Sequence, residues 1–128
     1  MGYTMQNIIY RDEGFAIIGA AYAVANELGC GFLESVYQEC LVHEFILREI
    51  PFQTQPELNL CYKGNQLHQT FRPDFICYDK IIIELKAVKE LHEQHQAQVL
   101  NYLKATGYHL GLLINFGESP LKSKRVVH

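Results

Sequence analysis

The sequence predicts an α/β protein in which helices flank a mixed β-sheet, with elements in the order α-α-β-β-β-α-β. Three observations lead to this fold class. Two helical apolar repeats occupy residues 12–49, strand-like segments separated by turn signals fill residues 52–86, and a further helical segment precedes a strongly apolar strand. Antiparallel strands that lead into a helical crossover are typical of a mixed sheet.

The first helix is predicted from Asp12 to Leu28, and Gly29 suits the position just past its end. Apolar residues follow two helical stripes, one of Phe15, Ile18, Tyr22 and Ala25 and one of Ile17, Ala21, Val24 and Leu28. Two stripes predict burial on most sides, by the protein's own core or by a partner chain, so this helix is a candidate homodimer interface.

The second helix is predicted from Leu33 to Glu49, because Pro51 stops it. Strand-like segments follow at 52–60, 61–63, 66–77 and 81–86, with a turn at 63–65. A third helix is expected from Leu91 to Thr106, closed by Gly107, and a last strand at 108–116. The locally basic segment 121–125 is expected to be a solvated edge, with contact to phosphates as the alternative.

The 128 residues predict one domain, 1–128, with room for one good core. Net charge is −3, so no overall basic field indicates nucleic-acid binding, although a local patch can suffice. The four cysteines are widely spaced among apolar residues, which favours reduced thiols and a cytoplasmic location. Neither a signal peptide nor a membrane span is expected.

Charged residues interrupt the apolar stretch FRPDFICYDKIIIELK at residues 71–86. A three-residue loop at 78–80 would place Asp74 opposite Glu84, on the face that also carries Lys86, whereas a two-residue loop would split them between faces. Two carboxylates and an ammonium group at one place favour a Mg²⁺ site. The alternative is a cross-strand ion pair joining Asp74 or Glu84 to Lys86 or Arg72.

Three motifs make the chain resemble a known family. Pro73-Asp74 followed by Glu84-Leu85-Lys86 is similar to the signature of the PD-(D/E)XK nuclease superfamily. Upstream, Gly31, Glu34 and Tyr37 match the G-x-x-E-x-x-Y motif that names one small bacterial family within it. Downstream, Gln98 and Tyr102 match the Q-x-x-x-Y element of relatives similar to recombination exonucleases. The resemblance extends over roughly residues 17–127.

The resemblance implies a restriction-endonuclease-like fold and a nuclease that hydrolyses phosphodiester bonds, with DNA the expected substrate, by metal-activated water. It implies that Glu34, Asp74, Glu84 and the Leu85 carbonyl ligate Mg²⁺ or Mn²⁺. It also implies that Lys86 orients the water and that Gln98 and Tyr102 steady the site or contact the nucleic-acid backbone. Two alternatives remain: a non-catalytic nucleic-acid or protein binding module with the same fold, and a metal-dependent hydrolase of a smaller phosphate ester.

Overall fold

A computed structural model of the chain describes residues 8–128. The helices are α1 (Arg11–Leu28), α2 (Glu34–Leu47) and α3 (Glu93–Thr106). The strands are β1 (Phe52–Thr54), β2 (Leu58–Tyr62), β3 (Asn65–Phe71), β4 (Phe75–Cys77), β5 (Ile81–Lys86), β6 (Leu110–Asn115) and β7 (Lys122–Val127).

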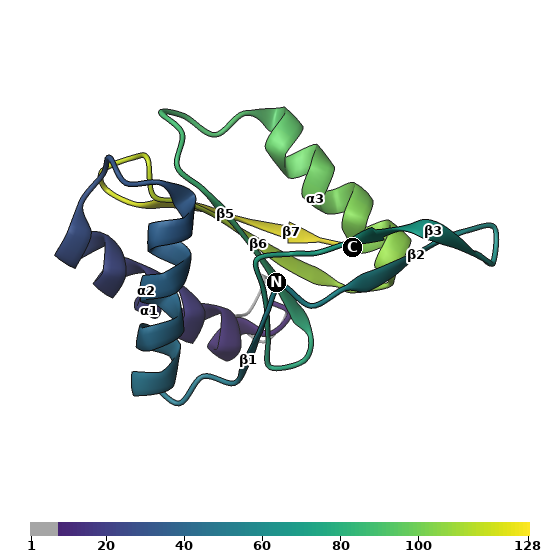
Figure 1. Cartoon of the computed structure of the whole chain (residues 1–128), viewed down its shortest axis with the longest axis horizontal. Coiled ribbons are helices and arrows are strands. Elements are labelled where there is room, and N and C mark those ends of the chain that lie inside the picture. The colour runs from purple at the N-terminus through teal and green to yellow at the C-terminus, as the bar shows by residue number, and fades with distance from the viewer. Residues whose placement is uncertain (1–7) are drawn as a thin grey trace, which may run out of the picture.

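Five of these strands form a mixed sheet in the order β1-β4-β5-β6-β7. The β5–β6 pair is parallel and joined through α3, and the other pairs are antiparallel. Helices α1 and α2 cover one face and α3 covers the other (Figure 1). The predicted fold class, a mixed sheet flanked by helices, is confirmed.

Strand β5 lies at the centre of this sheet and is buried on both faces. Ile81, Ile83 and Leu85 pack against α1 and α2, whereas Ile82 packs under α3, because successive strand residues point to opposite faces. Helix α3 comes close to the sheet at Gly111 of β6, where an added Cβ would lie 2.6 Å from Val99 Cγ1. The sheet therefore holds β5 rigidly up to its polar end, Glu84–Lys86.

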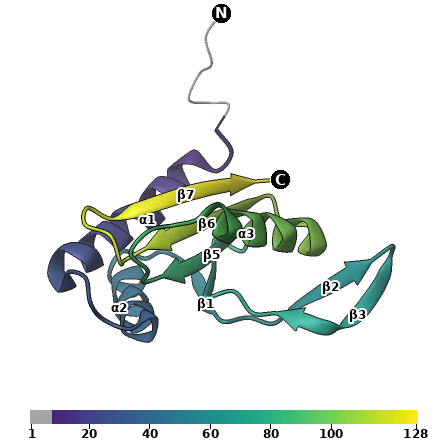
Figure 2. The ribbon, with the colours of Figure 1, turned by 90° about the horizontal axis from the view of Figure 1, so that it is seen from above.

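The strand expected at 66–77 is two strands in two different sheets. β3 pairs with β2 in a separate two-stranded sheet, whereas β4 belongs to the main sheet. The segment 72–74 separates them, and Pro73 has no N–H to continue a ladder. Likewise, the segment expected at 52–60 contains β1 and the start of β2. Figure 2 shows the β2–β3 hairpin extending away from the main sheet.

Strand β7 was not predicted. It pairs antiparallel with β6 at the edge of the main sheet, and of its six residues only Val126 is buried. Its main-chain pairing to β6 holds it in the sheet although its side chains carry almost no apolar signal. The expectation that 121–125 is a solvated edge is therefore correct for the side chains of residues 122–125, wrong for Leu121, which is buried, and incomplete for the backbone.

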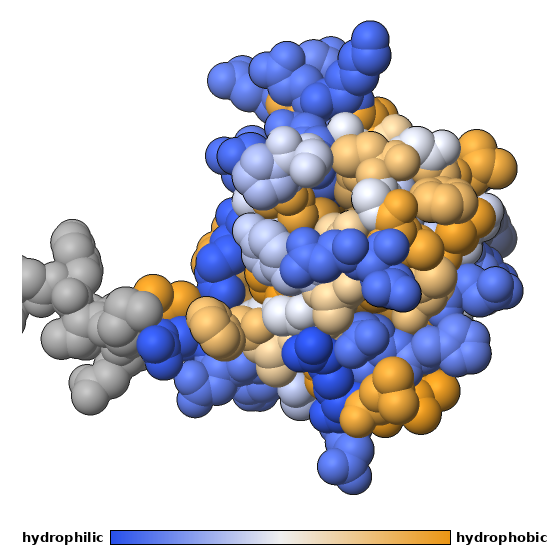
Figure 3. Space-filling model, turned by 90° about the vertical axis from the view of Figure 1, so that its left-hand side faces the viewer, coloured by the Kyte–Doolittle hydropathy of each residue, from blue (hydrophilic) through white to orange (hydrophobic). Residues whose placement is uncertain are grey.

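Helix α1 buries one of its two apolar stripes and only part of the other within the chain. Ile17 and Ala21 are fully buried, but Phe15 is 80% exposed and Tyr22 42% exposed. Figure 3 shows apolar surface, in orange, on the side of the molecule where α1 and α2 lie. The expectation that α1 is buried on most sides is not met by this chain alone, and a homodimer through this helix stays a prediction.

Two further expectations concern the thiols and the membrane. The four cysteines are free thiols. In residues 8–128, none of the helices combines the length and the hydropathy that a membrane span requires.

Candidate functional site

The hairpin between β4 and β5 has the register that the three-residue loop predicts. Cys77 pairs with Ile81, and Tyr78, Asp79 and Lys80 form the loop. Tyr78 and Asp79 both adopt positive φ, at 55° and 59°. Continued by one pair beyond Phe75–Ile83, this register sets Asp74 opposite Glu84. Of the two loops that the sequence allows, the three-residue loop is the one that forms.

Asp74 and Glu84 are interlocked by main-chain hydrogen bonds. The Asp74 N–H donates to Glu84 Oε1 at 3.0 Å, and the Leu85 N–H donates to Asp74 Oδ2 at 2.7 Å. The Gln38 side chain, from α2, donates to the Asp74 carbonyl at 3.4 Å. Each carboxylate is thus oriented by the backbone of the neighbouring strand, which leaves Asp74 Oδ1 and Glu84 Oε2 for other partners.

Both carboxyl groups hold protons more tightly than usual. Burial raises the pKa of Asp74, and the nearby charge of Glu34 raises it further, against the lowering effects of the Leu85 N–H and Lys86. Burial and then the charge of Asp74 raise the pKa of Glu84 to about 7. Two half-buried acids that repel one another in this way are typical of functional sites.

The ion-pair alternative is wrong for this structure. Arg72 pairs with Glu57 at 3.1 Å and makes no ion pair with Asp74 or Glu84. Within residues 8–128, Lys86 forms no ion pair either, although its charge lowers the pKa of both acids. The two carboxylates are therefore left without a paired cation, which is costly for half-buried charges.

Glu34 reaches the same region from the first turn of α2, where the helix dipole favours a carboxylate. Two other residues of its motif shape the approach. Gly31 has φ +106°, a conformation that side chains rarely adopt. The Tyr37 hydroxyl donates to the Gly29 carbonyl at 2.5 Å, and its buried ring stacks on Phe116 with centroids 4.5 Å apart. The motif thus fixes where α2 begins.

Replacing Tyr37 with Phe should destabilise the fold by about 1 kcal/mol, because the Gly29 carbonyl loses its donor while the stacked ring is kept. Urea unfolding measures this change. Tyr22→Phe is the matched control, since the Tyr22 hydroxyl makes only a 3.4 Å contact to the Leu121 carbonyl and is half exposed. Equal unfolding free energies for Tyr37→Phe and the wild type would contradict this role.

The oxygen donors partly fit a divalent cation. Two half-buried carboxylates with raised pKa values, each with one oxygen that makes no hydrogen bond within residues 8–128, form a donor set that such an ion would stabilise. Within that part of the chain, however, no three His, Cys, Asp or Glu side chains lie close enough to hold a metal ion. Glu34 lies near enough for its charge to raise the pKa of both Asp74 and Glu84, but it does not complete a three-residue metal cluster with them.

The Leu85 carbonyl is a further oxygen at this position. The N–H and C=O of one strand residue point to the same neighbouring strand, and the Leu85 N–H points to Asp74. Continuing the β4–β5 register sets Pro73 opposite Leu85, and Pro73 has no N–H to donate. The Leu85 carbonyl therefore points toward the segment that carries Asp74, and Pro73 donates no hydrogen bond to it.

Gln98 and Tyr102, on α3, are not joined to the acidic residues. Gln98 is exposed, and neither side chain hydrogen-bonds to Asp74, Glu84 or Lys86 in the region that the structure covers. The Tyr102 ring stacks on Phe71 at 3.7 Å between centroids, so it supports the end of β3. Their predicted contact with substrate stays a prediction.

Sequence reasoning did not find two residues that organise the site. Gln38 was not singled out because an exposed-looking glutamine on a helix gives no signal. Asn115 is fully buried and exchanges hydrogen bonds with the Val88 N–H and C=O, at 3.0 and 2.9 Å, which fixes the loop that follows Lys86. The sequence could have pointed to Asn115, because it is the polar residue at the end of the otherwise apolar strand LGLLIN.

Comparison with known proteins gives one family match. The family described as the PD-(D/E)XK nuclease superfamily matches residues 11–126. No curated protein matches the chain. Among solved structures, the crystal structure of SSO0001 is similar, with a TM-score of 0.49 and 16% identity over 90% of this chain and 77% of that one.

Proposed function

Because the chain belongs to the PD-(D/E)XK nuclease superfamily, we propose that it is a Mg²⁺- or Mn²⁺-dependent nuclease that hydrolyses phosphodiester bonds in DNA. The observation that carries this proposal is a pair of half-buried carboxylates, Asp74 and Glu84. Neither forms an ion pair with a cationic side chain within residues 8–128, and both have raised pKa values. A substrate phosphate would need a cation between itself and these acids.

In this proposal Asp74, Glu84 and the Leu85 carbonyl would hold the cation, and the exposed side chain of Glu34 would complete the set. When bound, the divalent ion supplies Lewis-acid polarisation of the phosphate and lowers the pKa of water. The Lys86 side chain, beside the acids, would hold the attacking water by hydrogen bonding and offset the charge that develops on the phosphate. Asp74 and Glu84 keep their orientation through the Leu85 and Asp74 N–H groups.

The finer assignments belong to the same proposal. The match to G-x-x-E-x-x-Y at residues 31–37 supports membership of the family that this motif names. Residues 1–128 act as one nuclease domain in the cytoplasm, with Gln98 and Tyr102 toward the nucleic-acid backbone. The exposed Phe15 and Tyr22 of α1 support a homodimer, and analytical ultracentrifugation measures that state directly.

The test is incubation of the protein with supercoiled plasmid, linear duplex DNA and RNA, in Mg²⁺, in Mn²⁺ and in EDTA. We expect cleavage of DNA that requires the divalent ion and stops in EDTA. Nicking of the plasmid distinguishes internal cutting from digestion at ends. Absence of cleavage on every substrate with either ion would contradict the proposal.

A non-catalytic binding module is the second candidate, favoured by the lack of a three-residue metal cluster within residues 8–128. Calorimetric titration with Mg²⁺ separates the two. If the wild type binds Mg²⁺ and Glu84→Gln does not, the nuclease is supported. If the wild type binds DNA but no metal ion, the binding module is supported.

A further inference from the structure

The β2–β3 hairpin is an arm that projects beside the candidate site. Residues 58–71, hereafter the arm, form a separate two-stranded sheet that extends away from the main sheet (Figure 2). From Cys61 to Thr70 every residue is exposed. Only its base is covered, where Leu58 and Leu60 are partly buried against α3 and Phe71 stacks on Tyr102. Most of the arm is thus not needed to cover the core.

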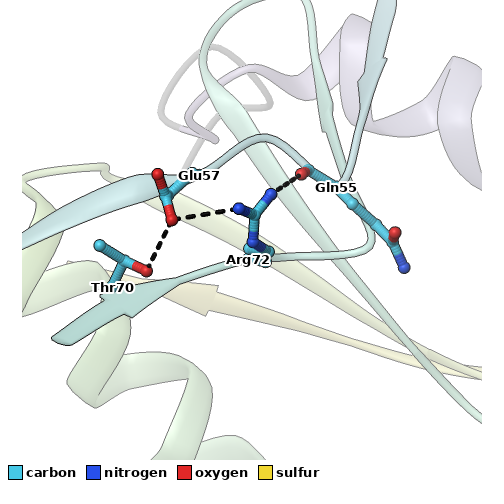
Figure 4. A network of polar contacts seen from close by, with 4 residues as sticks. All are labelled: Gln55, Glu57, Thr70 and Arg72. Carbon is cyan, nitrogen blue, oxygen red and sulfur yellow. Dashed lines mark hydrogen bonds and ion pairs between the residues drawn. The ribbon is translucent and has the colours of Figure 1, made fainter.

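The base of the arm is tied to the site. Arg72 donates to the Gln55 carbonyl at 3.4 Å and to Glu57 Oε2 at 3.1 Å, and Thr70 donates to the same Glu57 oxygen at 3.1 Å (Figure 4). These contacts join the segment that leads into the arm to the segment that follows it. The Gln55 N–H in turn donates to the Asp74 carbonyl at 3.0 Å. The arm and Asp74 are therefore parts of one hydrogen-bonded unit.

The arm is free of acidic residues and rich in amide side chains, and it also exposes Tyr62 and Leu67. The chain has 14 acidic residues, yet none lies between Leu58 and Phe71, where Lys63 and His68 are the basic side chains. The exposed polar residues are mostly amides and hydroxyls, namely Asn59, Asn65, Gln66, Gln69 and Thr70. Amide side chains donate and accept at once, which suits the edges of base pairs. The absence of acids avoids repulsion from phosphates.

We propose that the arm inserts into the major groove of B-form duplex DNA and sets the duplex against the candidate site. A two-stranded β-ribbon fits this groove, which is about 12 Å wide and 8.5 Å deep. At about 3.4 Å per residue a five-residue strand reaches roughly 17 Å, enough to reach the groove floor. Asp74 follows Phe71 by three residues, which span at most about 11 Å, so a phosphate at the groove border lies within reach of the site.

The proposal rests on the proposed function for its substrate class and deepens it by selecting duplex DNA over duplex RNA. The major groove of A-form RNA is deep and narrow, and side chains do not read it. An inserted ribbon therefore contributes to binding of a DNA duplex and not of an RNA duplex with the same sequence.

The test is fluorescence anisotropy in EDTA with a labelled DNA duplex and the matching RNA duplex, so that no cleavage takes place. Gln66→Glu with Gln69→Glu adds two negative charges to the arm. The control, Asn26→Glu with Ser123→Glu, adds the same charge at exposed positions on α1 and β7. We expect the arm variant to lose about 10-fold or more in affinity for the DNA duplex, relative to the control. Its affinity for RNA should match that of the control.

Equal DNA affinities for the arm variant and the control would overturn the proposal, and so would an equal loss on DNA and RNA or a wild type that binds no duplex DNA. Lys63→Glu, at the turn of the arm, gives a second variant in case the first unfolds. A wild type that binds DNA through the arm but never cleaves it with Mg²⁺ or Mn²⁺ would leave the arm proposal standing and reject the nuclease.

Discussion

Lys86→Met should lower the rate of DNA cleavage by about three orders of magnitude while the protein stays folded. Lys86 is the cation whose charge acts on both Asp74 and Glu84, and it makes no ion pair within residues 8–128 that would hold it elsewhere. Methionine keeps most of the length of the side chain and removes only the ammonium. The loss therefore reports the charge and its hydrogen bonds.

Asp74→Asn should reduce cleavage to a similar extent for a different reason. The amide oxygen of asparagine still accepts from the Leu85 N–H, so the strand geometry is kept, but the negative charge that would hold a cation is lost. Rates are measured under single-turnover conditions with saturating Mg²⁺, and circular dichroism checks the fold.

Lys122→Met, at an exposed position of β7, is the control for Lys86→Met and should cleave at the wild-type rate. If either Lys86→Met or Asp74→Asn cleaves as fast as the control, the site proposed here is not where the chemistry takes place.

Glu84→Gln should stabilise the metal-free protein at pH 8 by up to about 3 kcal/mol and at the same time remove its activity. The glutamine oxygen can keep the bond from the Asp74 N–H, but the neutral side chain avoids the cost of burying a charge beside Asp74. A gain in stability with a loss of activity is the signature of a strained functional group.

The pH dependence follows from the direction of the shift. Burial raises the pKa of Glu84 from 4.5 to about 7, so between these values the folded state binds more protons than the unfolded state. The free energy of unfolding of the wild type therefore falls as the pH rises from about 4.5 to about 7. Glu84→Gln lacks this contribution, so the free energies of unfolding of the two proteins should differ little near pH 5 and most at pH 8.

Urea unfolding at pH 5 and pH 8 in EDTA measures the free energy of unfolding of both proteins. Glu90→Gln, at an exposed position, is the control and should follow the wild type. Mg²⁺ should stabilise the wild type at pH 8 and leave Glu84→Gln unchanged, because the ion binds the ionised pair. A wild type whose stability rises from pH 5 to pH 8, or a variant no more stable than it at pH 8, contradicts the account.

Much of the sheet around β5 was predictable from local patterns. The turn residues at 78–80 allowed two β4–β5 registers, and the structure has the one with a three-residue loop. Hydropathy did not choose between them, because β5 is buried on both faces and carries isoleucines on each. The split between β3 and β4 was missed because both strands read as one extended run. Only the main-chain partners, β2 for one and β1 with β5 for the other, separate them.

For α1, the apolar pattern of the sequence predicted more burial than the structure has. Phe15 and Ile17 give the same apolar signal in the sequence, yet one is 80% exposed and the other fully buried. Hydropathy counts apolar residues on a helix but does not say how many neighbouring elements there are to cover them. Packing within the chain covers one stripe of α1 and leaves Phe15 and Tyr22 of the other on the surface.

At the candidate site, the sequence by itself determined which groups are present and which strand positions carry them, because side chains alternate at a fixed period along β5. Only the tertiary structure decided how they pair. Arg72 was as near to Asp74 in sequence as any cation, but the fold directs it to Glu57 at the base of the arm and leaves Asp74 and Glu84 facing each other. The choice of ionic partner depends on distances between separate strands and on burial, and neither is encoded in local spacing.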